Sequence, residues 1–170
     1  MATELKAIAD WLLKAKAGVI RNIQEDAECK EYSGCNFQVE STKIRYRKAK
    51  ITPKKVGQFV TLWRRNSHNQ TEPFDVNDTV DYYMIATLDK DRMGFSLFSK
   101  NVLSEKHILT HNNNAGKRGF RVYTDWDIPT SNQAESTKKW QKDYFIDMTT
   151  DVNKNIKKFK ALFNEGTNNE

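Results

Sequence analysis

The sequence has few cysteines and no long apolar run. Its two cysteines, Cys29 and Cys35, are too few for a disulfide framework, and their spacing is not that of a CxxC redox pair. No uninterrupted apolar stretch approaches the ~18 residues that a membrane-spanning helix needs. The first 18 residues contain acids and lack a continuous apolar segment, so we expect no signal peptide and a cytoplasmic protein.

The motifs of common catalytic sites are also missing. The sequence contains neither GxGxxG nor GxSxG. A common type of metal-dependent nuclease needs an acid two residues before a strand lysine, but Phe98 stands two residues before Lys100. His107 and His111 have the spacing of two metal ligands on one helix, but no glutamate follows His107, and two surface histidines are the simpler interpretation. We therefore expect no catalytic residue, no metal site and no cofactor.

The composition is that of one globular domain. Hydrophobic residues make up 38% and charged residues 29% of the 170 residues, enough for a real core. We expect a single domain over 1–165 and a frayed tail over 166–170. The pattern of one helix, then strands, then two helices predicts an α+β fold, with an N-terminal helix, a mainly antiparallel central sheet and two C-terminal helices.

Hydrophobic periodicity predicts the helices. The first is expected to run for about 20 residues with Thr3 as its N-cap. Its apolar stripe is Leu5, Ile8, Leu12, Ala15, Val19 and Ile23. The closing helices are expected to begin at Asn132 and Asp151. Their inward residues are Trp140, Tyr144 and Met148 on the first, and Ile156, Phe159 and Phe163 on the second. One short helical turn is expected within 101–109.

Alternating apolar and polar residues predict the strands. They are expected at 35–41, 42–51, 81–88, 93–99 and 120–126, with an antiparallel hairpin over 81–99. The phase of alternation slips near Arg47–Lys48, which indicates a bend or bulge. The stretch 57–63 fits either a helix face or a buried strand, and its β-branched residues favour a strand. We expect 120–126 to pair near 43–51.

The basic residues are concentrated in one segment. Nine lysines and arginines stand between Lys43 and Arg65, and no acid occurs from Ser41 to Thr71. Of the 28 basic residues, 19 lie elsewhere, against 22 acids, so the excess positive charge is local. A local excess is typical of a surface that binds polyanions, and a solvated lysine-rich surface is the simpler alternative.

A second basic block is Gly116–Tyr123. Six of the eight arginines stand in these two blocks, and the planar guanidinium of arginine binds phosphates well. If 43–47 is a strand, Lys43, Arg45 and Arg47 project from one face at steps of ~6.6 Å, close to the spacing of phosphates, while Tyr46 faces the core. We predict that the two blocks lie side by side as one site for DNA or RNA that reads backbone or shape. The candidate residues are Lys43, Arg45, Arg47, Lys48, Lys50, Lys54, Lys55, Arg64, Arg65, Lys117, Arg118 and Arg121.

Five motifs occur in an order that resembles the MepB-like family of bacteria. They are KITPKKVGQFVTLWRR, PFD at 73–75, GFSLFSK, GKRGFRVYTDWD and TKKWQKDYF, and the resemblance covers about 28–148. The resemblance implies a core similar to that of restriction endonucleases, without a full set of catalytic residues. It does not imply any particular reaction, cofactor or ligand. Genes of this family often accompany those of multidrug efflux pumps. The resemblance therefore implies, as an alternative to nucleic-acid binding, a protein that is an accessory or regulatory partner of an efflux system.

Two alternatives to a non-enzymatic nucleic-acid-binding protein stay open. One is a metal-dependent nuclease with a non-standard site that uses Asp81 with Glu40 or Asp89, although Asp81 fits a strand-start cap better. The other is an accessory protein of an efflux system that binds a regulator or a pump loop.

Overall fold

The computed structural model, which describes residues 1–167, is built around a six-stranded sheet with the order β1-β2-β3-β8-β9-β11. Neighbouring strands are antiparallel except for β3 and β8, which run parallel. A three-stranded sheet has the order β10-β5-β4, and β6 pairs with β7. The strands are β1 (Ile20–Glu25), β2 (Cys35–Val39), β3 (Thr42–Lys48), β4 (Lys50–Thr52), β5 (Lys55–Thr61), β6 (Trp63–Arg65), β7 (Thr71–Pro73), β8 (Tyr82–Asp89), β9 (Arg92–Ser99), β10 (Gly119–Val122) and β11 (Phe145–Asp147).

The helices flank these sheets, and the fold is α+β as predicted. They are α1 (Thr3–Lys14), α2 (Lys100–Glu105), α3 (Asn132–Gln141) and α4 (Val152–Thr167), with 3-10 turns η1 (Ala27–Tyr32) and η2 (Lys142–Tyr144). No helix within residues 1–167 combines the length and apolar character needed to cross a bilayer. The frayed end predicted for 166–170 falls mainly on 168–170, which lie outside the described residues.

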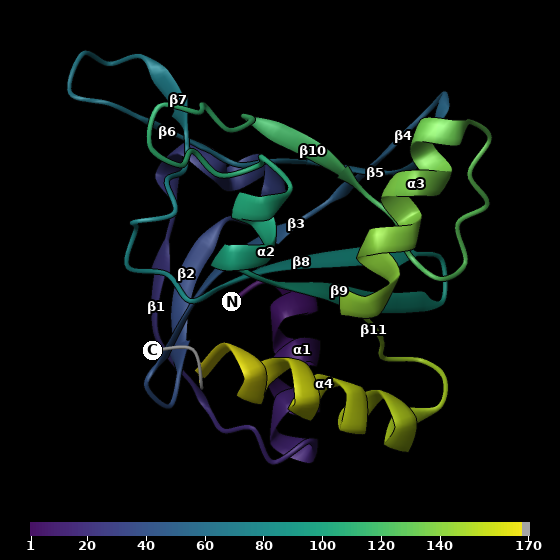
Figure 1. Cartoon of the computed structure of the whole chain (residues 1–170). Helices are drawn as coiled ribbons and strands as arrows, with labels where there is room; N and C mark the ends of the chain where they lie inside the picture. Colours follow the sequence, from purple (N-terminus) through teal and green to yellow (C-terminus); the bar gives the residue numbers. More distant parts are fainter. Residues whose placement is uncertain (168–170) are drawn as a thin grey trace.

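The molecule has three layers (Figure 1). Helices α1 and α4 cover one face of the six-stranded sheet, and the three-stranded sheet with α2 and α3 lies on the other. Strand β8 contributes to both cores, because Tyr82 and Met84 face the helices while Tyr83 and Ile85 face the small sheet. A strand covered on both faces is apolar at successive positions, which explains the run YYMIAT.

The bend predicted near Arg47–Lys48 lies where the chain passes from the large sheet to the small one. Strand β3 ends at Lys48 and β4 begins at Lys50. Between them, Ala49 donates its backbone N–H to the carbonyl of Ala86 in β8 at 2.9 Å, so this residue is still bonded to the large sheet. The strand interpretation of 57–63 is confirmed by β5 and β6, and the hairpin at 81–99 by the pairing of β8 with β9.

The prediction of a 20-residue first helix is wrong. Helix α1 ends at Lys14, and the backbone turns at Lys16 (φ 58°) and Gly18 (φ 132°), conformations that a helix cannot contain. The N-cap is Ala2 rather than Thr3, with no hydrogen bond from its side chain. Residues 20–25 instead pair with β2 as strand β1.

The helical spacing of apolar residues in α1 continues through Val19 and Ile23 only by coincidence. Val19 is 48% and Ile23 is 37% exposed, so these two positions do not extend the helix face that Leu5, Ile8 and Leu12 bury. Backbone pairing along the edge of the sheet decides the conformation there, and tertiary context overrides the local pattern.

Two further predictions about the second half of the chain need correction. The helix that begins at Asn132 ends at Gln141, so Tyr144 lies in η2, and Met148 follows the short strand β11, which joins the sheet beside β9. Strand β10 pairs with β5 and not with 43–51. Helix α4 behaves as expected, with Ile156, Phe159 and Phe163 packed into the core.

Candidate nucleic-acid interface

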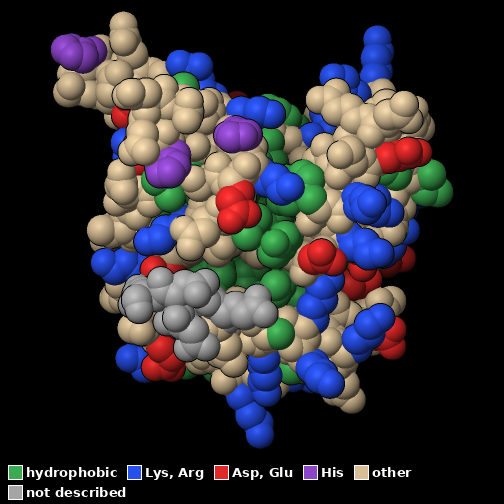
Figure 2. Space-filling view, viewed as in Figure 1, with side chains coloured by type: hydrophobic (Ala, Val, Ile, Leu, Met, Phe, Trp, Pro, Cys, Tyr) green, Lys and Arg blue, Asp and Glu red, His purple; other side chains and the backbone are tan. Residues whose placement is uncertain are grey.

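A cleft of about 450 Å³ lies between β10 and α3. One wall is formed by β10 and the turn that joins β4 to β5, the other by α3, and the segment after α2 closes one end. Figure 2 shows apolar side chains at the floor of the hollow between α2 and α3. We call it the cationic cleft, after the five basic residues that line it: Lys54, Lys55, Lys106, Lys117 and Arg121.

The cleft stays open because α3 presents a small and polar face to the sheet. Gln133, Ala134, Thr137 and Gln141 recur at steps of one, three and four, so they share one side of the helix. Side chains of this size and polarity cannot fill the space against β10 as leucines would. At the C-terminal end of α3 the two walls meet through the Trp140–Gln141 pair of residues.

Gln141 fastens α3 to β10. Its buried side-chain amide accepts a hydrogen bond from the backbone N–H of Tyr123 at 2.7 Å and donates to the carbonyl of Arg121 at 2.9 Å. These are backbone groups on the edge of β10 that does not face β5. A single glutamine thus pairs with the strand edge as a neighbouring strand would, and sets the separation of the cleft walls at this end.

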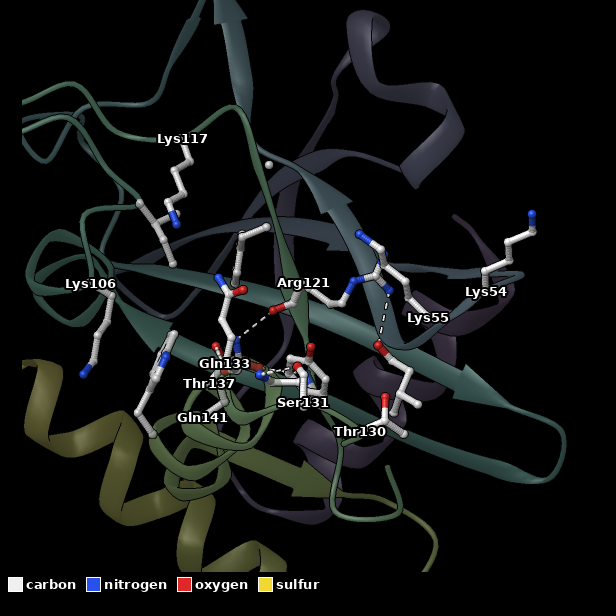
Figure 3. A pocket seen from close by; sticks show the side chains of 17 residues that line it. Lys54, Lys55, Lys106, Lys117, Arg121, Thr130, Ser131, Gln133, Thr137 and Gln141 are labelled. Atoms are coloured by element: carbon white, nitrogen blue, oxygen red, sulfur yellow. Dashed lines mark hydrogen bonds between the residues drawn. The ribbon is translucent and has the colours of Figure 1, made fainter. Parts of the chain in front are cut away.

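The five cations of the cleft have no carboxylate partner. Within residues 1–167, none of them forms an ion pair, and none of the side chains that line the cleft is acidic. Figure 3 shows Lys106 and Lys117 at one end, Lys54 and Lys55 at the other, and Arg121 between them. Lysines without carboxylate partners in one concave site produce a positive potential that attracts anions.

Arg121 is held by half of its guanidinium. Its Nη1 donates to Thr52 Oγ1 at 3.0 Å and to the carbonyl of Gly57 at 3.1 Å, with a longer contact of 3.4 Å to the carbonyl of Val56. Among the described residues, Nη2 and Nε have no acceptor. A guanidinium fixed on one side and open on the other is suited to bind a phosphate.

The first turn of α3 adds to this potential. Ser131 is the N-cap, with Oγ accepting from the N–H of Ala134 at 3.2 Å, and both residues line the cleft. The positive end of the helix dipole therefore lies toward the end of the cleft that carries Lys54 and Lys55. This contribution supplements the side-chain charges.

Two comparisons with known proteins agree with each other. The MepB-like family model matches residues 26–147. The chain belongs to the MepB-like family. Among solved structures, the crystal structure of MepB is similar, with a TM-score of 0.77 and 31% sequence identity over 88% of this chain and 99% of the MepB chain. A search of curated proteins gave no match. The matched range of this MepB-like chain includes all five cations of the cleft.

The structure brings together four of the predicted site residues, Lys54, Lys55, Lys117 and Arg121. They come from both basic blocks, so the middle of the first block, at Lys54 and Lys55, does lie beside the second. Lys106 was missed by the sequence analysis, because it stands alone between Glu105 and His107. Its ammonium lies 5.3 Å from the centre of the Trp140 ring, across the end of the cleft.

Arg45 and Arg47 do not belong to this site. Alternation along β3 does place both on the side opposite Tyr46, but their side chains are only 12% and 1% exposed. Arg45 stacks over Phe74 at 3.7 Å and donates to Asp78 at 3.3 Å. Arg47 is 1% exposed, so it cannot contact a phosphate in the folded chain.

Six of the nine basic residues in the acid-free stretch are paired with acids from elsewhere in the chain. Lys48 pairs with Glu4 at 2.7 Å, and the hydrogen bond from Lys48 lowers the pKa of the Glu4 carboxyl. Three more predicted residues also form ion pairs: Lys50 with Glu31, Arg64 with Glu72 and Asp78, and Arg65 with Glu28.

The two remaining candidates lie apart from the cleft. Lys43 is exposed on β3 and lines a separate pocket with Arg45. Arg118 is directed toward the β6–β7 hairpin, where it donates to the carbonyl and the hydroxyl of Thr71. Neither residue contributes to the cationic cleft.

Two of the residues considered for a nuclease site, Asp81 and Asp89, lie far apart. Asp81 Oδ2 accepts from the backbone N–H of Lys43 at 2.8 Å, which confirms its interpretation as a strand-start cap. Asp89 stands at the other end of β8, about 26 Å away along an extended strand, and pairs with Arg92. These two carboxylates cannot hold one metal ion. Within residues 1–167, no three His, Cys, Asp or Glu side chains form a group that could do so.

Proposed function

We propose that this MepB-like protein binds nucleic acid through phosphate contacts in the cationic cleft. The observation that carries the proposal is that five basic side chains, without a carboxylate partner in the described chain, line one concave site. Elsewhere on this protein most basic side chains of the first block are matched by acids. Concentrating unmatched positive charge costs electrostatic free energy, which an anionic ligand offsets on binding.

The distribution of the charges favours a chain of phosphates over one small anion. Thr61 on β5 pairs with Gly119 of β10, and Lys55 lies six residues from Thr61, about 20 Å along the strand. Lys117 stands just beyond the Gly119 end. A single phosphate could contact only one end of this row, whereas a polynucleotide can contact both.

The chemistry of the cations favours contacts with the backbone over readout of base sequence. Four of the five are lysines, which act as flexible point charges. Such contacts position a nucleic acid without carrying sequence information, and they make the affinity strongly dependent on salt. We therefore expect binding of DNA or RNA without strong sequence preference.

A salt series on labelled oligonucleotides tests the proposal. Fluorescence anisotropy with random single strands and duplexes, from low to physiological salt, should give a linear fall of log affinity with log salt. The variant Lys54→Gln/Lys55→Gln/Lys117→Gln should bind about tenfold or more weakly at low salt. Its slope should be reduced by about 0.7–0.9 for each phosphate that the variant no longer neutralises.

Helix α4 supplies a matched control. Lys154, Lys157 and Lys160 are exposed, and α4 covers the opposite face of the six-stranded sheet. Replacing all three with Gln removes the same charge and should change the affinity less than twofold. If both triple variants lose affinity equally, or if the unmodified protein binds no oligonucleotide at low salt, the proposal is wrong.

A further inference from the structure

We infer that the ligand of the cationic cleft is a single strand, which lies between β10 and α3 with its phosphates toward β10 and its bases toward α3. The inference rests on the proposed function and adds the strand class and the orientation. It is carried by two independent features of the cleft: its small volume, and the different chemistry of its two walls.

The cleft is too small for a duplex to enter. Its volume is about 450 Å³. At one end Gln141 attaches α3 to β10 by two hydrogen bonds of 2.7 and 2.9 Å. A single strand can place unpaired bases in such a space, whereas the paired bases of a double helix are enclosed by two backbones and cannot enter it.

The wall formed by β10 and the β4–β5 turn carries the charge. Lys54, Lys55, Lys117 and Arg121 all belong to it, and Arg121 keeps Nη2 and Nε without an acceptor in residues 1–167. Their spacing along about 20 Å matches several consecutive phosphates and not one. This wall therefore suits the sugar–phosphate edge of a strand.

The wall formed by α3 is neutral and offers different contacts. Gln133 and Thr137 present side-chain donors and acceptors, and Trp140 presents part of an indole ring. Amide and hydroxyl groups bind the edges of bases, and an aromatic ring stacks on a base face without regard to its identity. Lys106, 5.3 Å from the ring centre of Trp140, adds a charge beside that stacking position. One charged wall and one amide-and-aromatic wall fit the two edges of a single strand.

An acidic peptide would use the charged wall but not the other. Carboxylates could replace phosphates on the lysines, yet a peptide of acidic residues has no planar ring to stack on Trp140. A duplex would turn its phosphates outward on both sides and meet a neutral wall on one of them. Single-stranded nucleic acid uses both walls.

Filling the cleft without changing its charge tests the inference. In Thr137→Trp the new indole occupies the space between α3 and β10, while all five cations remain. Ser136→Trp places the same side chain on the exposed side of α3 that does not line the cleft, and serves as the control. Gln133→Trp, at an exposed position of the cleft wall, is a second blocking variant in case Thr137→Trp fails to fold. Circular dichroism and thermal unfolding establish that each variant is folded.

The probes are fluorescein-labelled oligo(dT), oligo(rU), a hairpin duplex and poly-glutamate, all at one salt concentration. Both single strands should bind at least tenfold more tightly than the duplex. Thr137→Trp or Gln133→Trp should weaken single-strand binding about tenfold or more, and Ser136→Trp less than twofold. The comparison of oligo(dT) with oligo(rU) shows whether the 2′-hydroxyl contributes to the affinity.

The outcomes separate this inference from the proposed function. If the duplex binds as tightly as the single strands, or if the folded blocking variants bind single strands normally, the inference is overturned and nucleic-acid binding still stands. If poly-glutamate binds and the nucleic acids do not, both are overturned. Binding of single strands that disappears on blocking supports both.

Discussion

The Nη2 atom of Arg47 donates to Oδ2 of Asp26 at 2.8 Å, and this pair joins the start of η1 to the middle layer of the fold. Arg47 also donates through Nη1 to the carbonyl of Tyr46 at 2.8 Å. Burial lowers the pKa of the Arg47 guanidinium, while the neighbouring Cys29 and Asp26 act in the opposite direction. The residue that looked from its sequence like a phosphate ligand is therefore a structural cation.

Removing Asp26 should destabilise the protein without affecting oligonucleotide binding at the cleft. Asp26→Ala leaves the guanidinium of Arg47 buried without its carboxylate, and such a change costs about 3–5 kcal/mol. Because the side chain of Asp26 is 28% exposed, we expect a value near 3 kcal/mol at the lower end of that range. Urea unfolding at neutral pH measures it.

An exposed ion pair provides the comparison for Asp26. Glu31→Ala removes the partner of Lys50, both of whose side chains are largely in solvent, and should cost less than about 1 kcal/mol. Adding Arg47→Met to Asp26→Ala removes the buried charge itself and should recover part of the stability. Equal costs for Asp26→Ala and Glu31→Ala would contradict a structural role for the buried pair.

The cleft wall gives a second prediction. Gln141→Leu removes the amide that pairs with the backbone of Tyr123 and Arg121 and leaves both groups buried beside an apolar side chain. Two unsatisfied backbone groups should lower the free energy of unfolding by about 2–4 kcal/mol. Hydrogen exchange should also show weaker protection of the Tyr123 amide. Gln133→Leu, on the exposed first turn of the same helix, should cost less than about 0.5 kcal/mol, and similar effects at the two positions would argue against the fastening of α3 by Gln141.

Local patterns of the sequence predicted most of the fold. The hairpin of β8 and β9 was predicted because its strands are adjacent and their apolar residues face two cores. Strand β1 was not, because it is exposed along nearly its whole length and so lacks the alternation by which strands are recognised. Strand β11 has only three residues, fewer than a periodic pattern needs.

The candidate site could be predicted only in part, because the charge of a segment depends on partners distant in sequence. Lys48 and Glu4 are 44 residues apart, and Arg65 and Glu28 are 37 apart, yet both pairs are in contact. A run free of acids therefore says little about the charge at the surface. Lys54, Lys55 and Lys117, at the β4–β5 connection and in the segment before β10, form no ion pair within the described chain.

The turn between β11 and α4 should make stability depend on pH. Burial tends to raise the pKa of Asp147, but hydrogen bonds from the hydroxyls and N–H groups of Thr149 and Thr150 outweigh it and lower that pKa. A carboxyl whose folded pKa lies below its unfolded value stabilises the fold above the unfolded pKa of about 3.9, and this stability is lost as the pH falls through the folded pKa.

Asp147→Asn tests that dependence. At pH 6 the substitution should lower the free energy of unfolding by about 1–3 kcal/mol, because Asn accepts fewer and weaker hydrogen bonds. As the pH falls below the unfolded pKa of about 3.9 and through the lower folded pKa, the wild-type carboxyl becomes protonated and the difference between the two proteins should shrink. Urea unfolding over this range measures it. A difference that does not change with pH would show that the ionised form of Asp147 has no special role.

Both ends of the cationic cleft should contact one long oligonucleotide at the same time, whereas a short one should contact only one end. Lys54→Gln/Lys55→Gln removes two charges at one end, and Lys106→Gln/Lys117→Gln removes two at the other. The ends are about 20 Å apart, so a strand of ten or more nucleotides contacts both. For such a strand, each double variant should reduce the salt slope by roughly 1.4, and the two effects should add. A dinucleotide reaches only one end, so one double variant should weaken its binding and the other should leave it nearly unchanged. If each double variant instead impairs a different long ligand, the five cations do not form one site.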